Sequence, residues 1–189
     1  MFNMLYVKSN YSLLSSLLTI DDIIDYNIKN NRTSAVICDD NMYGTMEFIK
    51  KCNLKKIKPI VGLEVSINNY KILLYIKNYQ GYLNLIKICT RVNDNSITLE
   101  DIINYKDNLF FLVPYSSLDF YLEYRDKIKD IYLGFSNKKE ESEALIITKD
   151  IVYLKPCLYK SREYSNYLKY LYLIRDGKTI NDNISYDIL

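Results

Sequence analysis

The stretch AVICDDNMYGTMEFIKKCNLKKIKPIVGLEVSI, residues Ala35–Ile67, predicts a strand, a helix and a second strand in immediate succession. Its first residues are apolar and lead to a pair of aspartates. Its middle places the side chains of one buried helix face at i, i+3, i+4, i+7 spacing, namely Thr45, Phe48, Ile49 and Cys52. The last part opens at Pro59, which is tolerated at the first position of a strand, and continues as a nearly unbroken apolar run. This order is typical of a right-handed crossover between two parallel strands.

Three acidic side chains belong to this unit. Asp39 and Asp40 directly follow the first apolar run, and Glu64 lies within the second. Because α/β folds place their chemistry at the carboxyl ends of parallel strands, we expect these acids to lie at or near one edge of a sheet. They are therefore the first candidates for a functional site.

Strands and helices alternate along the rest of the chain. Besides the strand that opens at Pro59, the expected strands are Met4–Val7, Thr33–Ile37, Tyr70–Ile76, Leu109–Val113, Ile131–Phe135 and Ala144–Thr148. Helices are expected to begin at or near Thr19, Gly44, Gly81, Thr98, Ser116 or Ser117, and Ser161. About seven strands alternating with helices predict an irregular α/β barrel, in one domain spanning residues 1–189.

Local signals refine these expectations. Thr19 and Thr98 each precede an aspartate by three residues, which is the pattern of a helix capping box. The pair Asn68-Asn69 predicts a tight hairpin between two strands. The polar segment NKKEESE, residues 137–143, is shorter than the usual full helix, so we expect the barrel to be trimmed near its C-terminal part.

Charge and cysteine usage restrict the partners and the compartment. The 189 residues include 25 basic and 23 acidic side chains, and a net charge of +2 is too small to predict nucleic-acid binding by this chain alone. The four cysteines form no CxxC motif or close pair, so neither a zinc site nor a disulfide framework is indicated. No signal peptide precedes the first strand and the apolar runs are short, so we expect a cytoplasmic protein with no membrane partner.

Glycine spacing and the absence of histidine exclude several kinds of active site. The five glycines lie too far apart for GxGxxG, a phosphate-binding P-loop or a GxSxG elbow. Without histidine there is no Ser-His or Cys-His nucleophile and no imidazole base. The Asp-x-Asp arrangement of a polymerase palm is also absent, so nucleotide transfer cannot reside in these residues.

Three segments carry a family resemblance. They are MLYVKSNYSLLSS (Met4–Ser16), the runs NMYG, EF and IKPIVGLEV within Asp39–Val65, and ILLYIKNYQGYLNLIKI (Ile72–Ile88). In this order they resemble the PHP (polymerase and histidinol phosphatase) domain of the bacterial replicative DNA polymerase III alpha subunit. That family usually opens with His-Leu-His-Val-His-Ser-x-Tyr-Ser-Leu-Leu. Weaker similarity follows at Ile147–Leu154 and Leu173–Asp182. The resemblance implies a distorted (β/α)7 barrel of the PHP type.

The chain departs from the metal-binding version of this family at several ligand positions. The resemblance places Tyr6 and Lys8 at an early His-x-His pair, Cys38 in a Thr-Asp-[His/Asp] step, and Val152 at the histidine of a late Asp-x-His. The acids that remain are Asp39, Asp40, Glu64 and Asp150. A degenerate metal site, with no metal bound, is what the resemblance implies.

Two interpretations of these residual acids stay open. An all-carboxylate site would suit magnesium or manganese and would support a two-metal hydrolase. Alternatively, backbone amides or Lys8 hold the acids, and the Lys8 ammonium neutralises Glu64 or Asp150 in place of a metal. We favour the second interpretation because so many ligand positions are replaced. Cys38 is either a thiol activated by Lys8 or, as we favour, inert packing.

The resemblance implies a catalytically inactive PHP domain that acts as a structural and interaction scaffold in DNA replication. Its parent would be a DNA-directed DNA polymerase, a nucleotidyltransferase, with magnesium in the parent's palm and no cofactor in this domain. The implied partners are the palm and thumb of the alpha subunit, the proofreading exonuclease in some members, and DNA through the parent. The alternative is a metal-dependent phosphoesterase or pyrophosphatase with a carboxylate-only metal site, so activity of the chain itself stays open.

Overall fold

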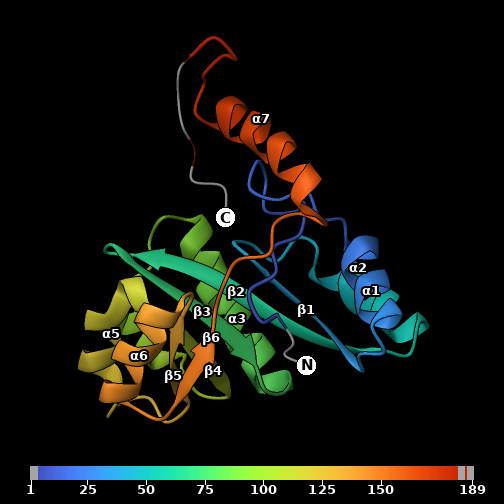
Figure 1. The fold of residues 1–189 in the computed structure, drawn as a ribbon. Helices are drawn as coiled ribbons and strands as arrows, with labels where there is room; N and C mark the ends of the chain where they lie inside the picture. Colours follow the sequence, from blue (N-terminus) through green and yellow to red (C-terminus); the bar gives the residue numbers. More distant parts are fainter. Residues whose placement is uncertain (1–3, 183–185, 187–189) are drawn as a thin grey trace.

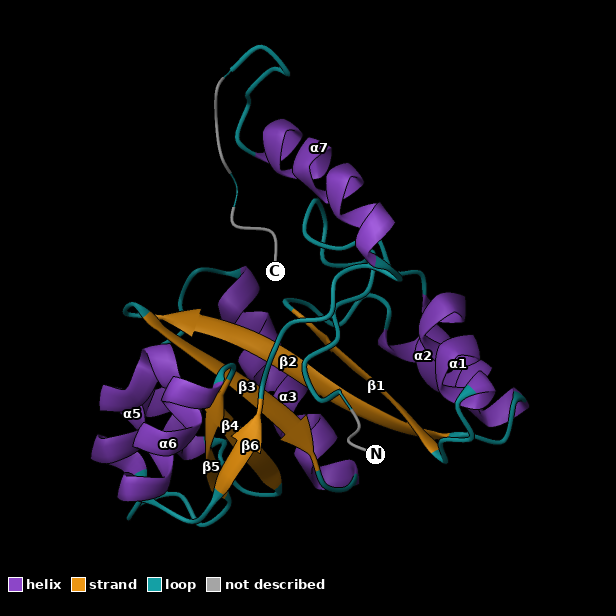
Figure 2. Ribbon diagram, viewed as in Figure 1, coloured by secondary structure: helices purple, strands orange, loops and turns teal. Residues whose placement is uncertain are grey.

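A curled sheet of six strands forms the centre of the computed structural model, which describes residues 4–182 and residue 186 (Figures 1 and 2). In sheet order the strands are β1 (Ser34–Asp39), β2 (Lys58–Ile67), β3 (Tyr70–Ile76), β4 (Leu109–Pro114), β5 (Ile131–Phe135) and β6 (Ile151–Tyr153). β3 is antiparallel to both of its neighbours, whereas β1 and β2, β4 and β5, and β5 and β6 pair in parallel. The fold is therefore mixed α/β with a half-barrel sheet.

Helices cover the outer face of this sheet. They are α1 (Ile20–Lys29), α2 (Thr45–Leu54), α3 (Tyr79–Asn93), α4 (Leu99–Asn104), α5 (Leu118–Tyr124) and α6 (Lys138–Ile147), and α7 (Ser165–Arg175) follows β6 and projects away from the sheet (Figure 1). Two short 3-10 turns, Tyr115–Ser117 and Arg162–Tyr164, precede α5 and α7. No helix within the described part of the chain is long and apolar enough to cross a membrane.

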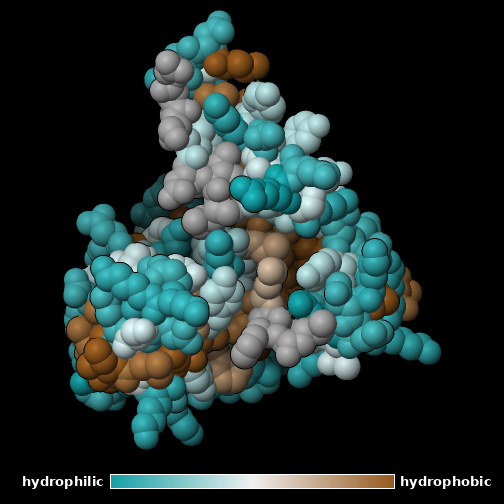
Figure 3. All heavy atoms as spheres, viewed as in Figure 1, coloured by the Kyte–Doolittle hydropathy of each residue, from teal (hydrophilic) through white to brown (hydrophobic). Residues whose placement is uncertain are grey.

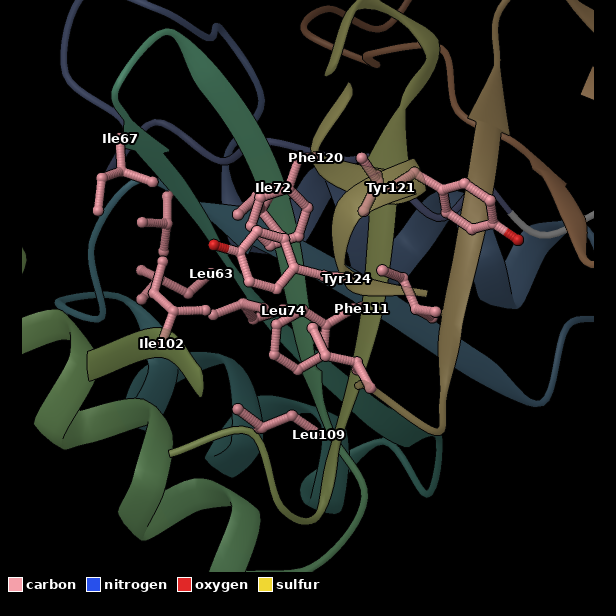
Figure 4. Close-up of a cluster of buried hydrophobic side chains, with 14 of the residues drawn as sticks. Leu63, Ile67, Ile72, Leu74, Ile102, Leu109, Phe111, Phe120, Tyr121 and Tyr124 are labelled. Carbon is pink, nitrogen blue, oxygen red and sulfur yellow. The ribbon is translucent and has the colours of Figure 1, made fainter. Parts of the chain in front are cut away.

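Side chains alternate between the two faces of the sheet, as strands require. On the helix-covered face, Leu63, Leu74, Phe111 and Phe120 belong to a large buried cluster (Figure 4). The inner face of the half-barrel carries a smaller cluster: Tyr6, Val36, Cys38, Leu73, Tyr75, Leu112 and Leu154. Figure 3 shows hydrophobic side chains in the hollow between the lobe of α5 and α6 and the lobe of α1 and α2.

A short segment lies between β1, at one edge of the sheet, and the chain that follows β6, and we call residues Tyr6–Lys8 the seam segment. Its Val7 carbonyl accepts a hydrogen bond from the Cys38 amide of β1 at 2.7 Å. On its other side, the Cys157 amide donates to the Tyr6 carbonyl at 2.8 Å, and the Lys8 amide donates to the Cys157 carbonyl at 3.2 Å. The expected strand Met4–Val7 is thus reduced to a bridge between Val7 and Cys157.

Most predicted element starts are present. The capping boxes of Thr19 with Asp22 and of Thr98 with Asp101 are both formed. Asn68 and Asn69 adopt positive φ values of 46° and 68° in the β2–β3 hairpin. Ser117 precedes α5, but its hydroxyl makes no cap and instead accepts from the Lys71 amide at 2.8 Å.

The predicted strand Ala144–Thr148 is wrong, because these residues complete α6 and end it. The segment expected to be trimmed forms the start of this helix, whose first turn is capped by the Asn137 side chain on the Glu140 amide at 3.0 Å. Only Ala144 of the helix is buried in the core, while Leu145 and Ile146 are exposed. An apolar run that faces solvent misled the assignment, and the last strand is β6, a few residues further on.

We predict that Gly81→Ala destabilises the fold although alanine favours helices. A Cβ at Gly81 would lie 2.1 Å from the Asn108 carbonyl oxygen, so α3 must move away from the loop before β4. Overpacking of this kind costs about 1–3 kcal/mol, which outweighs a helix-propensity gain of about 1 kcal/mol. Urea unfolding monitored by circular dichroism measures the loss. The neighbouring exposed change Gln80→Ala is the control, and an unchanged Gly81→Ala protein would contradict the contact.

Candidate functional site

Glu64 is the centre of a buried polar cluster on the inner face of the sheet. Strand register pairs Cys38 with Gly62, and alternation along β2 puts Glu64 on the same face as Cys38. Its carboxylate is buried, and its Oε2 accepts a hydrogen bond from the Tyr6 hydroxyl. The Lys8 Nζ lies 3.0 Å from Oε2, and the Lys71 Nζ lies 3.5 Å from Oε1. Two ammonium groups and one phenol therefore surround a single carboxylate.

The seam segment positions the first of these cations. Tyr6 and Lys8 point to the same side of the seam segment because they lie two residues apart in extended backbone. Lys8 is 8% exposed, and its Nζ lies between Glu64 and the Asp40 Oδ2, which is 3.7 Å away. Burial opposes the charge of Lys8, but Glu64 and then Asp40 outweigh it and raise the pKa of the ammonium. Lys8 is thus held as a cation inside the half-barrel.

The pKa of Glu64 responds to the same contacts with the opposite sign. Burial alone would raise it, but the charges of Lys8 and Lys71 and the hydrogen bond from Tyr6 together lower the pKa below its ordinary value. Burial and the adjacent Glu64 raise the pKa of Tyr6, so its hydroxyl keeps its proton and remains a donor. The cluster therefore contains an ionised carboxylate with fixed donors.

Asp39 has a separate set of partners in the loop after the seam segment. It is 2% exposed and accepts hydrogen bonds from the Ser9 amide at 2.6 Å, the Ser9 hydroxyl at 2.7 Å and the Ser12 hydroxyl at 2.8 Å. Burial raises the pKa of Asp39 although the serine hydrogen bonds oppose the change. Asp40 is half-exposed and accepts from the Asn41 side-chain amide at 2.8 Å. The Asp39 carboxylate and the Asp40 backbone amide, which donates to the Ser12 hydroxyl at 3.3 Å, tie the loop to the end of β1.

Asp150 does not join these acids. It is exposed and directly precedes β6, so it lies at the amino end of a strand parallel to β1. Asp39 is the last residue of β1, so it lies at the carboxyl ends of the parallel strands, whereas Asp150 lies at their amino ends. The predicted pairing of Lys8 therefore holds for Glu64 and not for Asp150. Val152 lies against the inner apolar cluster.

Cys38 is fully buried in that apolar cluster, and burial strongly raises the pKa of its thiol despite the opposing influence of Lys8. A thiol held in this way is not a nucleophile at neutral pH, because the thiolate is the reactive species. The geometry supports the packing role predicted for Cys38.

The donor set does not fit a divalent cation. Within residues 4–182 and residue 186, no group of three or more His, Cys, Asp or Glu side chains is arranged to hold a metal ion. Both oxygens of Asp39 are engaged by serines, and an ammonium lies between Asp40 and Glu64. A metal at this point would have to displace Lys8, whose charge repels it.

Sequence reasoning missed Ser9 and Ser12, which supply the hydrogen bonds to Asp39. It also missed Lys71, which reaches Glu64 from the strand next to β2. Serines in a loop give no sequence signal that identifies their acceptor. The hairpin register pairs Glu64 with Leu73, and Lys71 lies two residues from Leu73 on the same face of β3. The Asn68-Asn69 turn fixes this register, so the Lys71 contact could have been predicted from the sequence.

The sequence model of the PHP domain matches residues 5–157, most of the chain. The chain belongs to the PHP domain family. Over 88 residues it is 47% identical to DNA polymerase III subunit alpha of Ureaplasma parvum serovar 3, covering 46% of this chain and 9% of that protein. Over 188 residues it is 25% identical to DNA polymerase III subunit alpha of Streptococcus pyogenes serotype M3, covering 95% of this chain and 18% of that protein.

This PHP domain thus spans between about a tenth and a fifth of the length of these curated relatives. A solved structure from Bifidobacterium adolescentis, assigned as a metal-dependent phosphoesterase, covers 90% of this chain and 65% of that one at 11% identity. Its TM-score is 0.34.

We predict that Lys8→Met destabilises the PHP domain by about 2–4 kcal/mol, because removing one partner leaves Glu64 buried beside a weaker cation. Urea unfolding at neutral pH gives the change in the free energy of unfolding. Lys71→Met is the matched control and should cost less than about 1 kcal/mol, since the Lys71 side chain is 44% exposed. The double variant Lys8→Met/Glu64→Gln should recover part of the loss, and additive single effects would contradict the pairing.

We also predict a pH dependence that Glu64→Gln removes. The pKa of Glu64 is lower in the folded state than its ordinary value of about 4.3, so its contribution is present above that value and disappears as pH falls through the lowered pKa. The difference in unfolding free energy between the wild type and Glu64→Gln should shrink between pH 7 and pH 3. Asp39, whose pKa is shifted the other way, is common to both proteins and cancels. A constant difference over this range would contradict the assignment.

Proposed function

We propose that this PHP domain is a non-catalytic structural and interaction module of a larger replicative polymerase. The observation that carries the proposal is the Lys8 ammonium, 3.0 Å from the buried Glu64 carboxylate and in contact with Asp40. A fixed cation at this point supplies the charge compensation that a divalent ion would otherwise provide. The residues left in the site offer no free nucleophile and no group poised as a general base.

The carboxylates that remain have structural partners instead of reactive ones. Asp39 is saturated by serine donors, and Glu64 is held by Tyr6, Lys8 and Lys71. A hydrolase would need at least one carboxylate oriented toward a metal-bound water. This arrangement supports a barrel that keeps its shape by internal ion pairing. We propose that the six-stranded half-barrel is part of a closed, distorted barrel of the (β/α)7 type. In that barrel the seam segment, whose Val7 bridges to Cys157, takes the place of the seventh strand.

The larger polymerase follows from the relatives, each named DNA polymerase III subunit alpha and each several times longer than this chain. Within such a parent, a DNA-directed DNA polymerase, the PHP domain would pack against the palm and thumb and help to hold a proofreading exonuclease. Contact with DNA would come through the parent, whose palm would bind the magnesium ions. The proposed location is the cytoplasm, where replication takes place in bacteria.

We predict that the purified chain carries no stoichiometric divalent metal after dialysis against manganese, zinc or magnesium. Because Lys8 occupies the position between Asp40 and Glu64, elemental analysis of the wild type and of Glu64→Gln should give the same low content. Hydrolysis of p-nitrophenyl phosphate and of pyrophosphate should stay at the level of the buffer with each metal.

The same measurements detect the alternative function, a metal-dependent phosphoesterase or pyrophosphatase with a carboxylate-only site. Stoichiometric metal that is lost with Glu64→Gln, together with hydrolysis that is lost in parallel, would replace the scaffold proposal. The exposed variant Asp150→Asn is the matched control, because Asp150 lies at the other edge of the sheet and should change neither quantity.

A further inference from the structure

A second polar feature lies outside the Glu64 cluster, in a cavity of about 270 Å³ beside α1. Val7 of the seam segment and its bridge partner Cys157 form part of its wall, and Leu18, Ile23 and Val36 are among its apolar lining residues. The volume far exceeds the roughly 15 Å³ that a single water molecule requires. The cavity is thus large enough for a small organic molecule.

Arg32 faces this cavity with part of its guanidinium unpaired. Its Nη1 donates to the Asn27 side-chain oxygen at 3.3 Å, and its guanidinium carbon lies 5.3 Å from the centre of the Tyr26 ring. Its Nε is buried, and it is the one buried side-chain nitrogen or oxygen among the described residues that lacks a hydrogen-bond partner. A buried donor without an acceptor is costly, more so on a charged group.

The charges around the cavity leave Arg32 as its uncompensated cation. Of the two acids in the wall, Asp22 pairs with Lys160 at 2.6 Å and Asp25 pairs with Lys55 at 2.5 Å. No carboxylate pairs with Arg32 among the residues that the structure describes. With both acids paired, the cavity has a single unmatched positive charge, which is matched by a ligand with one negative charge on an apolar body and not by a polyanion such as a nucleotide.

We propose that this cavity binds a small monocarboxylic acid with an aromatic or aliphatic body. Its carboxylate accepts from Arg32 Nε, which is on the edge of the guanidinium suited to planar carboxylate recognition. Its apolar body contacts Leu18, Ile23 and Val36. The bound acid contacts α1, β1, Val7 and Cys157 at once, so it reinforces the bridge between the seam segment and the chain after β6.

Benzoate is the test ligand, and benzamide is its uncharged counterpart of the same shape. Titration of the ¹⁵N-labelled full chain to about 20 mM, a range suited to a ligand of this size, reports binding through amide shifts. We expect shifts at Ile23, Arg32 and Cys157, and affinity at least about tenfold weaker for benzamide because the charge-assisted hydrogen bond is lost.

Variants of Arg32 decide the assignment. Arg32→Gln should weaken benzoate binding at least about tenfold, and Arg32→Lys should not restore it, because lysine keeps the charge but lacks the Nε edge. Arg175→Gln is the matched control: it removes an arginine on α7 that pairs with Asp176 at 2.7 Å and should leave binding unchanged. The proposal is overturned if benzoate gives no shifts at the cavity amides, if benzamide binds equally well, or if Arg32→Gln retains full affinity.

Discussion

The contact between Lys8 and Glu64 couples two features of the fold. One is the backbone link between β1 and the chain after β6, and the other is the burial of carboxylates on the inner face of the sheet. Lys8 belongs to the seam segment, whose backbone links β1 to Cys157, and its side chain reaches the carboxylate of β2 at 3.0 Å. Moving the seam segment would withdraw the cation from Glu64, and neutralising Glu64 would remove a partner of both Tyr6 and Lys8. The backbone link and the ion pair therefore stabilise one another. Their joint contribution to stability is larger than the sum of the two contributions taken separately.

A buried acid also orders the loop between the seam segment and α1. Asp39 accepts three hydrogen bonds from Ser9 and Ser12, so an acid at the carboxyl end of β1 orders a loop that has no secondary structure of its own. Each of these donors would otherwise be buried without an acceptor. Asp39 therefore has a structural role, because its removal would leave these hydroxyl and amide groups unpaired.

Local sequence signals made the order of the helices and strands predictable. Features that depend on contacts between distant parts of the chain could not be predicted. Two helix starts can be predicted from capping boxes, formed by Thr19 with Asp22 and by Thr98 with Asp101. The hairpin can be predicted from the pair Asn68-Asn69. The run Ala144–Thr148 is predicted as a strand because its apolar residues do not reveal whether they face the core or solvent, and most of it is in fact the end of α6. The family resemblance groups Asp150 with Glu64 through a late Asp-x-His motif, but Asp150 directly precedes β6 and so lies at the amino end of that strand, away from Glu64. Arg32 and Ser12 gave no sequence signal, since each depends on contacts that the chain makes only when folded.

Charge balance explains how the inner face of the half-barrel can hold buried carboxylates. Neutral histidines in a metal-binding relative would leave the carboxylates to be compensated by the ion itself. Here Lys8 and Lys71 bring two positive charges to Glu64 and Asp40 from within the chain. A metal lost without such replacement would leave mutually repelling, desolvated acids whose pKa values rise until they take up protons. Lys8 therefore supplies the compensating positive charge from within the chain, and this charge depends on no ligand from solution.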